Sequence, residues 1–374
     1  MKFIDLNKQY DQIKDKVNED ILNNLKKGDF ILGENVYNLE KKLSEYVGVK
    51  ECITCASGTD ALQIPLMAYN IGPGDAVFTT NFSYFATTEV ISLVGATPVF
   101  IDIDDRTFNI NPELLEKEIL KTLDSNILTP KAIIAVDLFG QLANYNAIQV
   151  IAKKYNLVLI EDAAQSFGAS LKNKKSCSFG DVAATSFFPA KPFGCYGDGG
   201  AIFTNNNELA NLCRSIRVHG KGKDKYDNIR VGLNSRLDTI QASVLLNKLD
   251  IFNNELDKRN SIANYYSDKL KNHLIVPLIS EDYISSWAQY SLLAKSNNER
   301  DDLINYLNKA GIPTAIYYKK IFSDLEIYSS QINKVFPISK DISQRIFSIP
   351  MHPYLEEEEI IKITDTIKEY FYNE

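Results

Sequence analysis

Short apolar runs alternate with stretches of helical spacing through the first two thirds of the sequence. The runs at 75–80, 98–102, 131–136 and 157–160 have the length and composition of buried strands. Repeating units of this length favour a mostly parallel sheet with helices on both faces. In such a sheet the carboxyl ends of the strands border one crevice, and ligands bind there. The sequence therefore predicts an α/β fold whose functional residues lie where these runs end.

The chain has 374 residues, which is long enough to bury one large core and a smaller one. Apolar residues recur at helical intervals in three stretches, 84–94, 143–155 and 239–260. The last of these helices would connect a large cofactor-binding domain, residues 1–250, to a smaller C-terminal α+β domain, residues 251–374. In the smaller domain the polar segments 281–283 and 297–301 are expected to be loops.

Composition narrows the class of protein. The net charge of −7, without any basic block, argues against a nucleic-acid partner. No apolar run approaches the roughly 20 residues of a membrane span, and the first residues lack the apolar core of a signal peptide. Five scattered cysteines indicate reduced thiols and a cytoplasmic protein. Cys52 and Cys55 form a lone CxxC, for which packing on a strand is favoured over a redox or metal role, and no metal site is predicted.

Two of the apolar runs end in residues that suit an aldehyde cofactor with a ring nitrogen. The run 157–160 ends in Glu161 and Asp162, and Lys191 follows the run 182–188. Lys191 would form a Schiff base with pyridoxal 5′-phosphate (PLP) and then carry a proton between substrate and cofactor. Asp162 would keep the pyridine nitrogen protonated. Taken singly, the two residues are equally well explained as a surface lysine and a helix N-cap. The glycine-rich run at 194–200 favours the cofactor site.

Five motifs give the chain a resemblance to a known family. The sequence resembles the DegT family of nucleotide-sugar aminotransferases, which are PLP enzymes of the fold-type I, aspartate-aminotransferase-like class. Within that family it is most similar to enzymes that aminate carbon 3 of UDP-2-acetamido-2-deoxy-3-oxo-glucuronate. The resemblance extends from Phe3 to about Tyr354. The motifs lie at 57–62, 161–165, 186–191, 197–200 and 234–238.

This resemblance implies further cofactor ligands. Gly58 and Thr59, at a strand-to-helix turn, would offer backbone N–H groups and a hydroxyl to the cofactor phosphate; an ordinary helix N-cap is the alternative. Ser186 would be another phosphate donor. Gln165 would bond the ring hydroxyl, and Tyr84 would stack on the ring unless it is plain core.

One implied ligand comes from a second subunit. Asn234 matches the family residue that reaches the phosphate from the neighbouring chain, which implies a homodimer with shared active sites. The same comparison proposes five substrate-binding residues: Gly33, His219, Arg236, Tyr317 and Tyr318. For Arg236 an ion pair with Asp238 is nearly as well supported. For His219 a solvated loop with the neighbouring lysines is favoured, and His352 is expected to be structural.

Two departures from the family pattern concern the sugar. Tyr317 and Tyr318 stand in the segment where the 3-oxo-glucuronate enzymes tend to have His-Tyr-Pro, and Asp137 stands where many relatives carry a histidine. Both positions are expected to border the sugar. The carbon-6 group of the sugar is therefore left open.

The sequence thus predicts a PLP-dependent aminotransferase. It would move an amino group from glutamate to carbon 3 of a nucleotide-linked 3-oxo sugar, UDP-3-oxo-GlcNAc or its uronate, for surface polysaccharide or lipid A biosynthesis. A dTDP-3-oxo-6-deoxyhexose 3-aminotransferase and a 4-keto-sugar 4-aminotransferase stay open. Lys191 argues against a PLP sugar dehydratase, because those relatives carry histidine at this position. The complete ligand set argues against a non-enzymatic PLP-binding protein.

Overall fold

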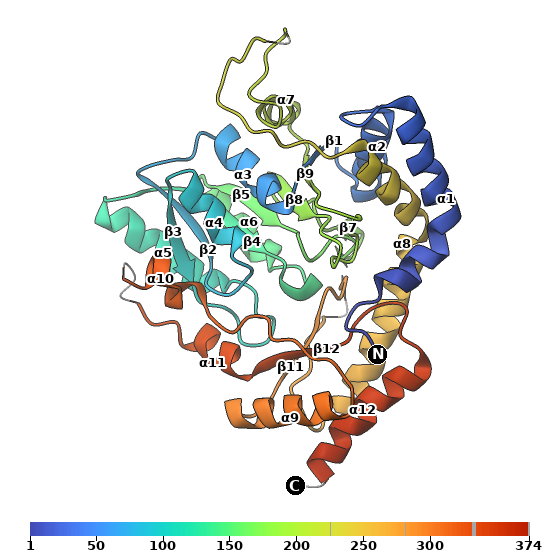
Figure 1. Ribbon diagram of the computed structural model, residues 1–374. Coiled ribbons are helices and arrows are strands. Elements are labelled where there is room, and N and C mark those ends of the chain that lie inside the picture. The colour runs from blue at the N-terminus through green and yellow to red at the C-terminus, as the bar shows by residue number, and fades with distance from the viewer. Residues whose placement is uncertain (225, 281, 331–333, 373–374) are drawn as a thin grey trace.

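A computed structural model describes residues 1–374 except 225, 281, 331–333 and 373–374 (Figure 1). In the described part of the chain, seven strands form the central sheet, in the order β1-β9-β8-β5-β4-β2-β3. Their bounds are β1 (Glu51–Cys55), β9 (Gly200–Thr204), β8 (Val182–Ser186), β5 (Val158–Asp162), β4 (Thr129–Val136), β2 (Asp75–Thr80) and β3 (Thr97–Ile101). β9 is antiparallel to both of its neighbours, and the other pairs are parallel. The predicted, mostly parallel α/β fold is confirmed.

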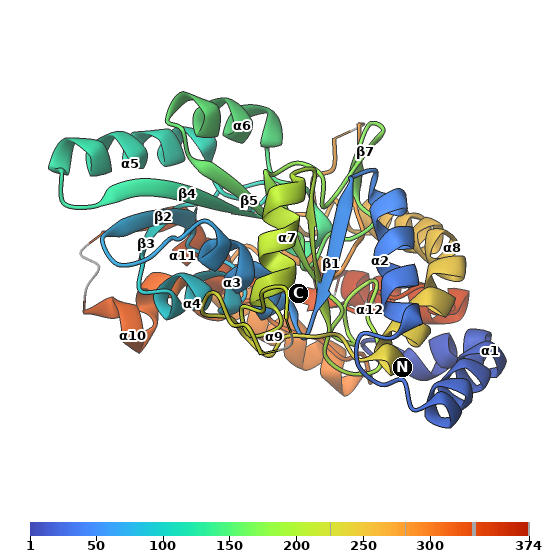
Figure 2. The same cartoon turned by 90° about the horizontal axis from the view of Figure 1, so that it is seen from above.

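Helices cover both faces of the sheet (Figure 2). One face packs against α3 (Gly58–Ala68), α4 (Ala86–Leu93) and α7 (Asn207–Ile216). The other face packs against α2 (Glu34–Val47), α5 (Pro112–Ser125), α6 (Tyr145–Lys154) and α8 (Thr239–Leu270). The strands are apolar on both sides for this reason: in β8, Val182 and Ala184 enter one core and Ala183 enters the other.

The C-terminal part forms its own core around the far half of α8. The elements there are β11 (Tyr290–Leu293), α9 (Asn297–Lys309), η2 (Phe322–Asp324), α10 (Glu326–Ser329), α11 (Pro337–Arg345), β12 (Ile346–Ile349) and α12 (Glu357–Tyr372). Tyr266 of α8, Leu303 of α9 and Ile363 of α12 meet in this core. α1 (Leu6–Lys27) packs along α8 at the edge of the molecule (Figure 1). The domain division at residue 250 stays a prediction, since α8 runs through it without a break.

Two predictions about the C-terminal part need correction. The segment 297–301, predicted to be a loop, is the first turn of α9. Ser296 Oγ accepts the N–H of Glu299, and the Glu299 carboxylate accepts the N–H of Lys295, so the polar residues cap a helix. Within 281–283, Tyr283 lies in β10 (Tyr283–Ile284), which pairs with β6 (Ser170–Leu171) beside β7 (Lys174–Lys175). Glu281 lies outside the described residues.

The two cysteines of the CxxC are packed into separate cores. Cys52 and Cys55 are both buried on β1, and each belongs to the core on a different face of the sheet. Residues three apart on a strand point to opposite faces, so their thiols do not face one another. Burial raises the pKa of both thiols.

Among the described helices, none has the length and apolar character needed to cross a bilayer.

Candidate active site

The carboxyl ends of β5 and β8 bring Asp162 close to Lys191. Asp162 pairs with Ala184 across the two strands, and after β8 the chain folds back on itself. The N–H of Lys191 donates to the carbonyl of Phe188, and the N–H of Cys195 donates to the carbonyl of Phe187. Burial lowers the pKa of Lys191 to about 8, although the nearby Asp162 charge acts in the opposite direction. A neutral amine is the nucleophilic form, so this environment suits attack on an aldehyde.

The Asp162 carboxylate is buried and is held at both oxygens. Thr87 Oγ1 of α4 donates to Oδ2 at 2.7 Å, and the N–H of Ala164 donates to Oδ1 at 3.2 Å. Burial raises the pKa of Asp162, while Thr87, Ala164 and the charge of Lys191 act to lower it. The contact with Ala164 resembles the predicted N-cap, but it occupies one oxygen only. Thr87, which the sequence did not predict at this site, is thus a partner of Asp162.

Gln165 is oriented by two contacts. Its Oε1 accepts the N–H of Phe139, in the short turn η1 (Leu138–Gly140), at 2.7 Å. Its Nε2 donates to the Tyr318 hydroxyl at 3.1 Å. Tyr318, predicted at the substrate, thus also contacts a predicted cofactor residue. Burial raises the pKa of Tyr318, which keeps its hydroxyl protonated.

The turn between β1 and α3 fits a phosphate group. Ser57 is the N-cap of α3, with its Oγ accepting the N–H of Asp60 at 3.1 Å. Gly58 and Thr59 are therefore the first helical residues, and their N–H groups have no acceptor within the helix. Gly58 packs directly on β8, because a Cβ added there would lie 2.6 Å from the Cβ of Ser186. Two free N–H groups and the hydroxyls of Thr59 and Ser186 thus gather at one helix N-terminus, the arrangement that binds phosphate.

Aromatic rings border the same region. The Tyr84 ring lies 6.4 Å from that of Tyr318 and is 60% exposed, so Tyr84 is not part of the core. Phe188, next to the lysine loop, is 51% exposed. The Tyr317 ring contacts those of Tyr318 and Phe3, which joins the N-terminal segment to this edge.

Three predicted residues lie in or beside a loop that projects from the body, between α7 and α8 (Figure 1, top). His219 is exposed, and its N–H donates to the carbonyl of Leu233. Arg236 donates to Oδ1 of the exposed Asn234, and no ion pair with Asp238 is found in the described part of the chain. No hydrogen bond joins this loop to the Asp162, Gln165 or Lys191 side chains among the described residues. Asn234 is exposed, and its contact with a second subunit stays a prediction.

Gly33 lies beside the start of α8. Its N–H donates to Thr239 Oγ1 at 3.1 Å, and the N–H of Thr239 donates to the carbonyl of Phe30. The N-terminal segment therefore runs alongside the chain that follows Asn234 and Arg236. A Cβ at residue 33 would overlap the present position of the Asp29 carboxylate, so that side chain would have to turn away.

Asp137 does not border the sugar as predicted. Its carboxylate is fully buried and accepts hydrogen bonds from Tyr145 Oη at 2.8 Å, the N–H of Ala143 at 2.9 Å and Ser166 Oγ at 2.7 Å. Burial, together with the Glu161 charge, raises the pKa of Asp137. The residue stabilises the turn behind Gln165.

His352 is likewise buried, and its Nδ1 accepts the N–H of Tyr354. Burial lowers its pKa to about 4, in keeping with a structural role.

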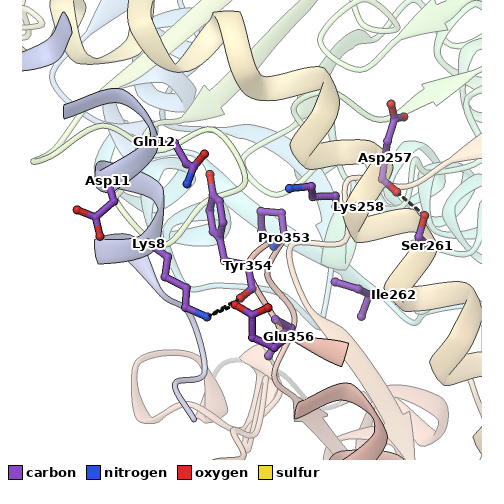
Figure 3. Close-up of a pocket in the computed structure, with 11 residues that line it drawn as sticks. Lys8, Asp11, Gln12, Asp257, Lys258, Ser261, Ile262, Pro353, Tyr354 and Glu356 are labelled. Carbon is purple, nitrogen blue, oxygen red and sulfur yellow. Dashed lines mark hydrogen bonds and ion pairs between the residues drawn. The ribbon is translucent and has the colours of Figure 1, made fainter. Parts of the chain in front are cut away.

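A separate open hollow of about 550 Å³ lies between α1, α8 and the loop that precedes α12 (Figure 3). Lys8 crosses its rim and donates to Glu356 at 2.7 Å and to the carbonyl of Tyr354 at 3.2 Å. The residues that line it are Lys8, Asp11, Gln12, Asp257, Lys258, Ser261, Ile262, Pro353, Tyr354, Leu355 and Glu356. None of them belongs to the predicted site, and their charges are of both signs.

Comparison with known proteins agrees with this geometry. Residues 11–368 match the DegT/DnrJ/EryC1/StrS aminotransferase family. The UDP-2-acetamido-2-deoxy-3-oxo-D-glucuronate aminotransferase of Pseudomonas aeruginosa is 48% identical, over 95% of this chain and 96% of its own. A pleiotropic regulatory protein of Geobacillus stearothermophilus is 38% identical, over 98% of both chains. The dTDP-3-amino-3,6-dideoxy-alpha-D-galactopyranose transaminase of Aneurinibacillus thermoaerophilus is 37% identical, over 99% of both.

Solved structures extend the likeness to the whole chain and to the cofactor. The crystal structure of a DegT DnrJ EryC1 StrS aminotransferase from Brucella abortus is similar with a TM-score of 0.97 and 49% identity, covering 99% of each chain. A candidate sugar aminotransferase from Streptococcus pneumoniae, in its PLP form, has a TM-score of 0.87 and 26% identity, covering 96% of each chain. The lysine, acid and phosphate turn described above fit the same cofactor, PLP. The chain belongs to the DegT/DnrJ/EryC1/StrS family of aminotransferases.

Proposed function

We propose that this protein transfers an amino group to carbon 3 of a UDP-linked 3-oxo sugar. UDP-2-acetamido-2-deoxy-3-oxo-glucuronate is the first candidate substrate and UDP-3-oxo-GlcNAc the second. The observation that carries this proposal is the 48% identity, over 95% of the chain, with the Pseudomonas aeruginosa enzyme named for the uronate. The relative named for a dTDP-linked 3-amino sugar is 37% identical. It supports carbon 3 as well, and keeps a dTDP-3-oxo-6-deoxyhexose as the alternative.

Each residue of the site has a defined part in this reaction. Bound PLP supplies an electron sink for proton transfer at the amino-bearing carbon. Lys191 Nζ would hold the cofactor aldehyde and would then move the proton, a role that a pKa of about 8 favours near neutral pH. Asp162, held by Thr87, keeps a proton on the ring nitrogen. Gln165 and Tyr318 would orient the ring, and the turn at Gly58 and Thr59 would hold the phosphate together with Ser186.

We propose glutamate as the amino donor and a homodimer as the active form. Tyr84 and Phe188 lie at the site and are more than half exposed, which suits cover by a second chain. The projecting loop would carry Asn234 to the phosphate of that chain.

The five cysteines are all free and buried, which suits a reducing cytoplasm, where nucleotide sugars for surface polysaccharide or lipid A are made.

The experiment is a substrate panel with the PLP-loaded enzyme and glutamate. It contains UDP-3-oxo-GlcNAc, its uronate, a dTDP-3-oxo-6-deoxyhexose and a UDP-4-keto sugar, and NMR locates the new C–N bond. We expect turnover of a UDP-3-oxo sugar with nitrogen at carbon 3. Reaction of the 4-keto sugar alone would refute the proposal, and preference for the dTDP sugar would establish the alternative.

A further inference from the structure

Ser235 bridges both ends of the phosphate-binding turn. Its hydroxyl is fully buried, donates to Asp60 Oδ2 at 2.6 Å and accepts the N–H of Ala56 at 3.2 Å. A hydroxyl has one proton to donate and lone pairs to accept, so both contacts are compatible. Ala56 and Asp60 stand on either side of Gly58 and Thr59, the residues with the free N–H groups. One side chain from a distant segment thus closes the turn.

The bridge also determines where the Asp60 carboxylate lies. Asp60 is in the first turn of α3, where its charge is near the N–H groups that would bind phosphate. A carboxylate free to rotate there would bond those N–H groups itself and would repel the phosphate dianion. The short hydrogen bond to Ser235 Oγ instead holds one carboxylate oxygen on the Ser235 side.

The backbone of Ser235 is bonded to Arg217, whose side chain forms a buried ion pair. Its N–H donates to the carbonyl of Arg217 at 2.9 Å. The Arg217 guanidinium pairs with Glu40, and it donates to the carbonyl of Thr54 at 2.7 Å. Thr54 lies on β1, the strand that leads into the turn, and all of these groups are buried. The anchor and the turn therefore belong to one rigid unit.

We propose that Ser235 is a positioning residue for the cofactor phosphate: it closes the turn at Gly58 and Thr59 and holds the Asp60 charge away from the phosphate. This inference rests on the assignment of that turn to the phosphate in the proposed function. It gives a role to the serine of the 234–238 motif and to the aspartate of the 57–62 motif. It also joins the phosphate turn to the base of the loop that carries Asn234.

The test compares two aldehydes that differ only in the phosphate. The affinity of the apoenzyme for PLP and for pyridoxal is measured by fluorescence quenching in Ser235→Ala. The expected result is a fall in PLP affinity of roughly ten- to a hundredfold, the range for losing a hydrogen bond to a charged group, with pyridoxal affinity unchanged. Ser235→Cys, which nearly conserves volume, replaces Ser235→Ala if the alanine variant does not fold. The matched control is Ser291→Ala, which removes another buried serine hydroxyl, bonded to Ser348 in the C-terminal core.

A second substitution tests the role of the Asp60 charge. Asp60→Asn removes the charge and keeps an acceptor for Ser235, so on its own it should change PLP affinity by less than about threefold, a neutral-for-charged hydrogen-bond exchange. Added to Ser235→Ala, it should recover most of the lost affinity. An unchanged ratio of PLP to pyridoxal affinity in Ser235→Ala, or no recovery in the double variant, would overturn the inference.

Thr59→Val tests whether the turn binds the phosphate, separately from the role of Ser235. If Thr59→Val lowers PLP affinity and spares pyridoxal, the turn binds the phosphate, and the Ser235 result then decides the inference alone. If Thr59→Val leaves the ratio unchanged, the phosphate assignment is wrong and the inference falls with it. The proposed sugar substrate does not enter either measurement.

Discussion

The hydroxyl of Thr87 donates a 2.7 Å hydrogen bond to the carboxylate of Asp162. Thr87 lies on α4 and Asp162 at the end of β5, so this contact depends on the helix packing over the strand ends. It stabilises the ionised carboxylate, which is the form that would keep a proton on the cofactor ring. The acid predicted from sequence therefore depends on a partner that its own strand does not supply.

Replacing Thr87 by valine should weaken catalysis without unfolding the protein. The hydrogen bond lowers the pKa of Asp162, so its loss raises that pKa and disfavours the ionised acid. A hydrogen bond to a charged group contributes about 1.5–3 kcal/mol, so kcat should fall roughly ten- to a hundredfold. Steady-state kinetics measure the change. Thr88→Val is the control, because Thr88 is equally buried but bonds Tyr328 instead; an equal loss in both variants would contradict the role of Thr87.

Attachment of PLP to the apoenzyme should depend on pH through Lys191. Burial lowers the Lys191 pKa to about 8, and only the neutral amine attacks an aldehyde, so the association rate should rise with pH and level off above about 8. Stopped-flow absorbance at a series of pH values gives the apparent pKa. Because the Asp162 charge raises this pKa, Asp162→Asn should move the profile to lower pH. A midpoint near the ordinary lysine value would contradict this account.

The lowered pKa of Lys191 also makes the free energy of unfolding depend on pH. Between about pH 8 and the ordinary lysine pKa, the unfolded chain binds more protons at this residue than the folded apoenzyme does. The contribution of Lys191 to the free energy of unfolding should therefore rise with pH across that window. Urea unfolding of the apoenzyme and of Lys191→Met, compared at the two ends of the window, measures it. A stability difference that does not change with pH would argue against a half-buried, partly neutral lysine.

An alanine at residue 58 should damage the phosphate turn. The added Cβ would lie 2.6 Å from the Cβ and 3.1 Å from the Cα of Ser186, so the end of β8 would have to shift. PLP affinity should drop, with a smaller loss of stability, as measured by cofactor titration and thermal unfolding. Gly72→Ala is the matched control, since its Cβ would meet only a carbonyl oxygen at 3.5 Å. A Gly58→Ala enzyme with normal PLP affinity would show that the turn is not part of the site.

The sequence predicted β2, β3, β4, β5 and β8 because each is a short apolar run with a clear end, but it did not predict β9. β2 has the predicted bounds, and Lys191 and Asp162 follow from the residues that end two such runs. α8 continues ten residues beyond Asn260, since Tyr266 and Leu270 extend its buried side past polar residues that mark a helix end in sequence. The sequence did not predict the start of α9, because the residues that cap a helix are polar like those of a loop.

Contacts between distant segments are what the sequence could not give. Thr87, Ser235 and Tyr318 each approach the site from a different element. Which hydroxyl meets which acid depends on the packing angle of helices over the sheet, and no local pattern encodes that angle. Asp137 illustrates the same limit: it follows β4 as a site residue would, yet Tyr145 and Ser166 enclose it in the core.

The most direct measurement is the visible spectrum of PLP bound to Lys191→Ala. The wild-type protein should show a band at roughly 410–420 nm, as expected for PLP joined to a lysine, and Lys191→Ala should lose it while the phosphate turn still binds the cofactor. Lys175→Ala is the control, because Lys175 is a second half-buried lysine whose pKa burial also lowers. Loss of the band in Lys191→Ala alone is the predicted result. A band that survives in Lys191→Ala, or that is lost in Lys175→Ala, would contradict the account.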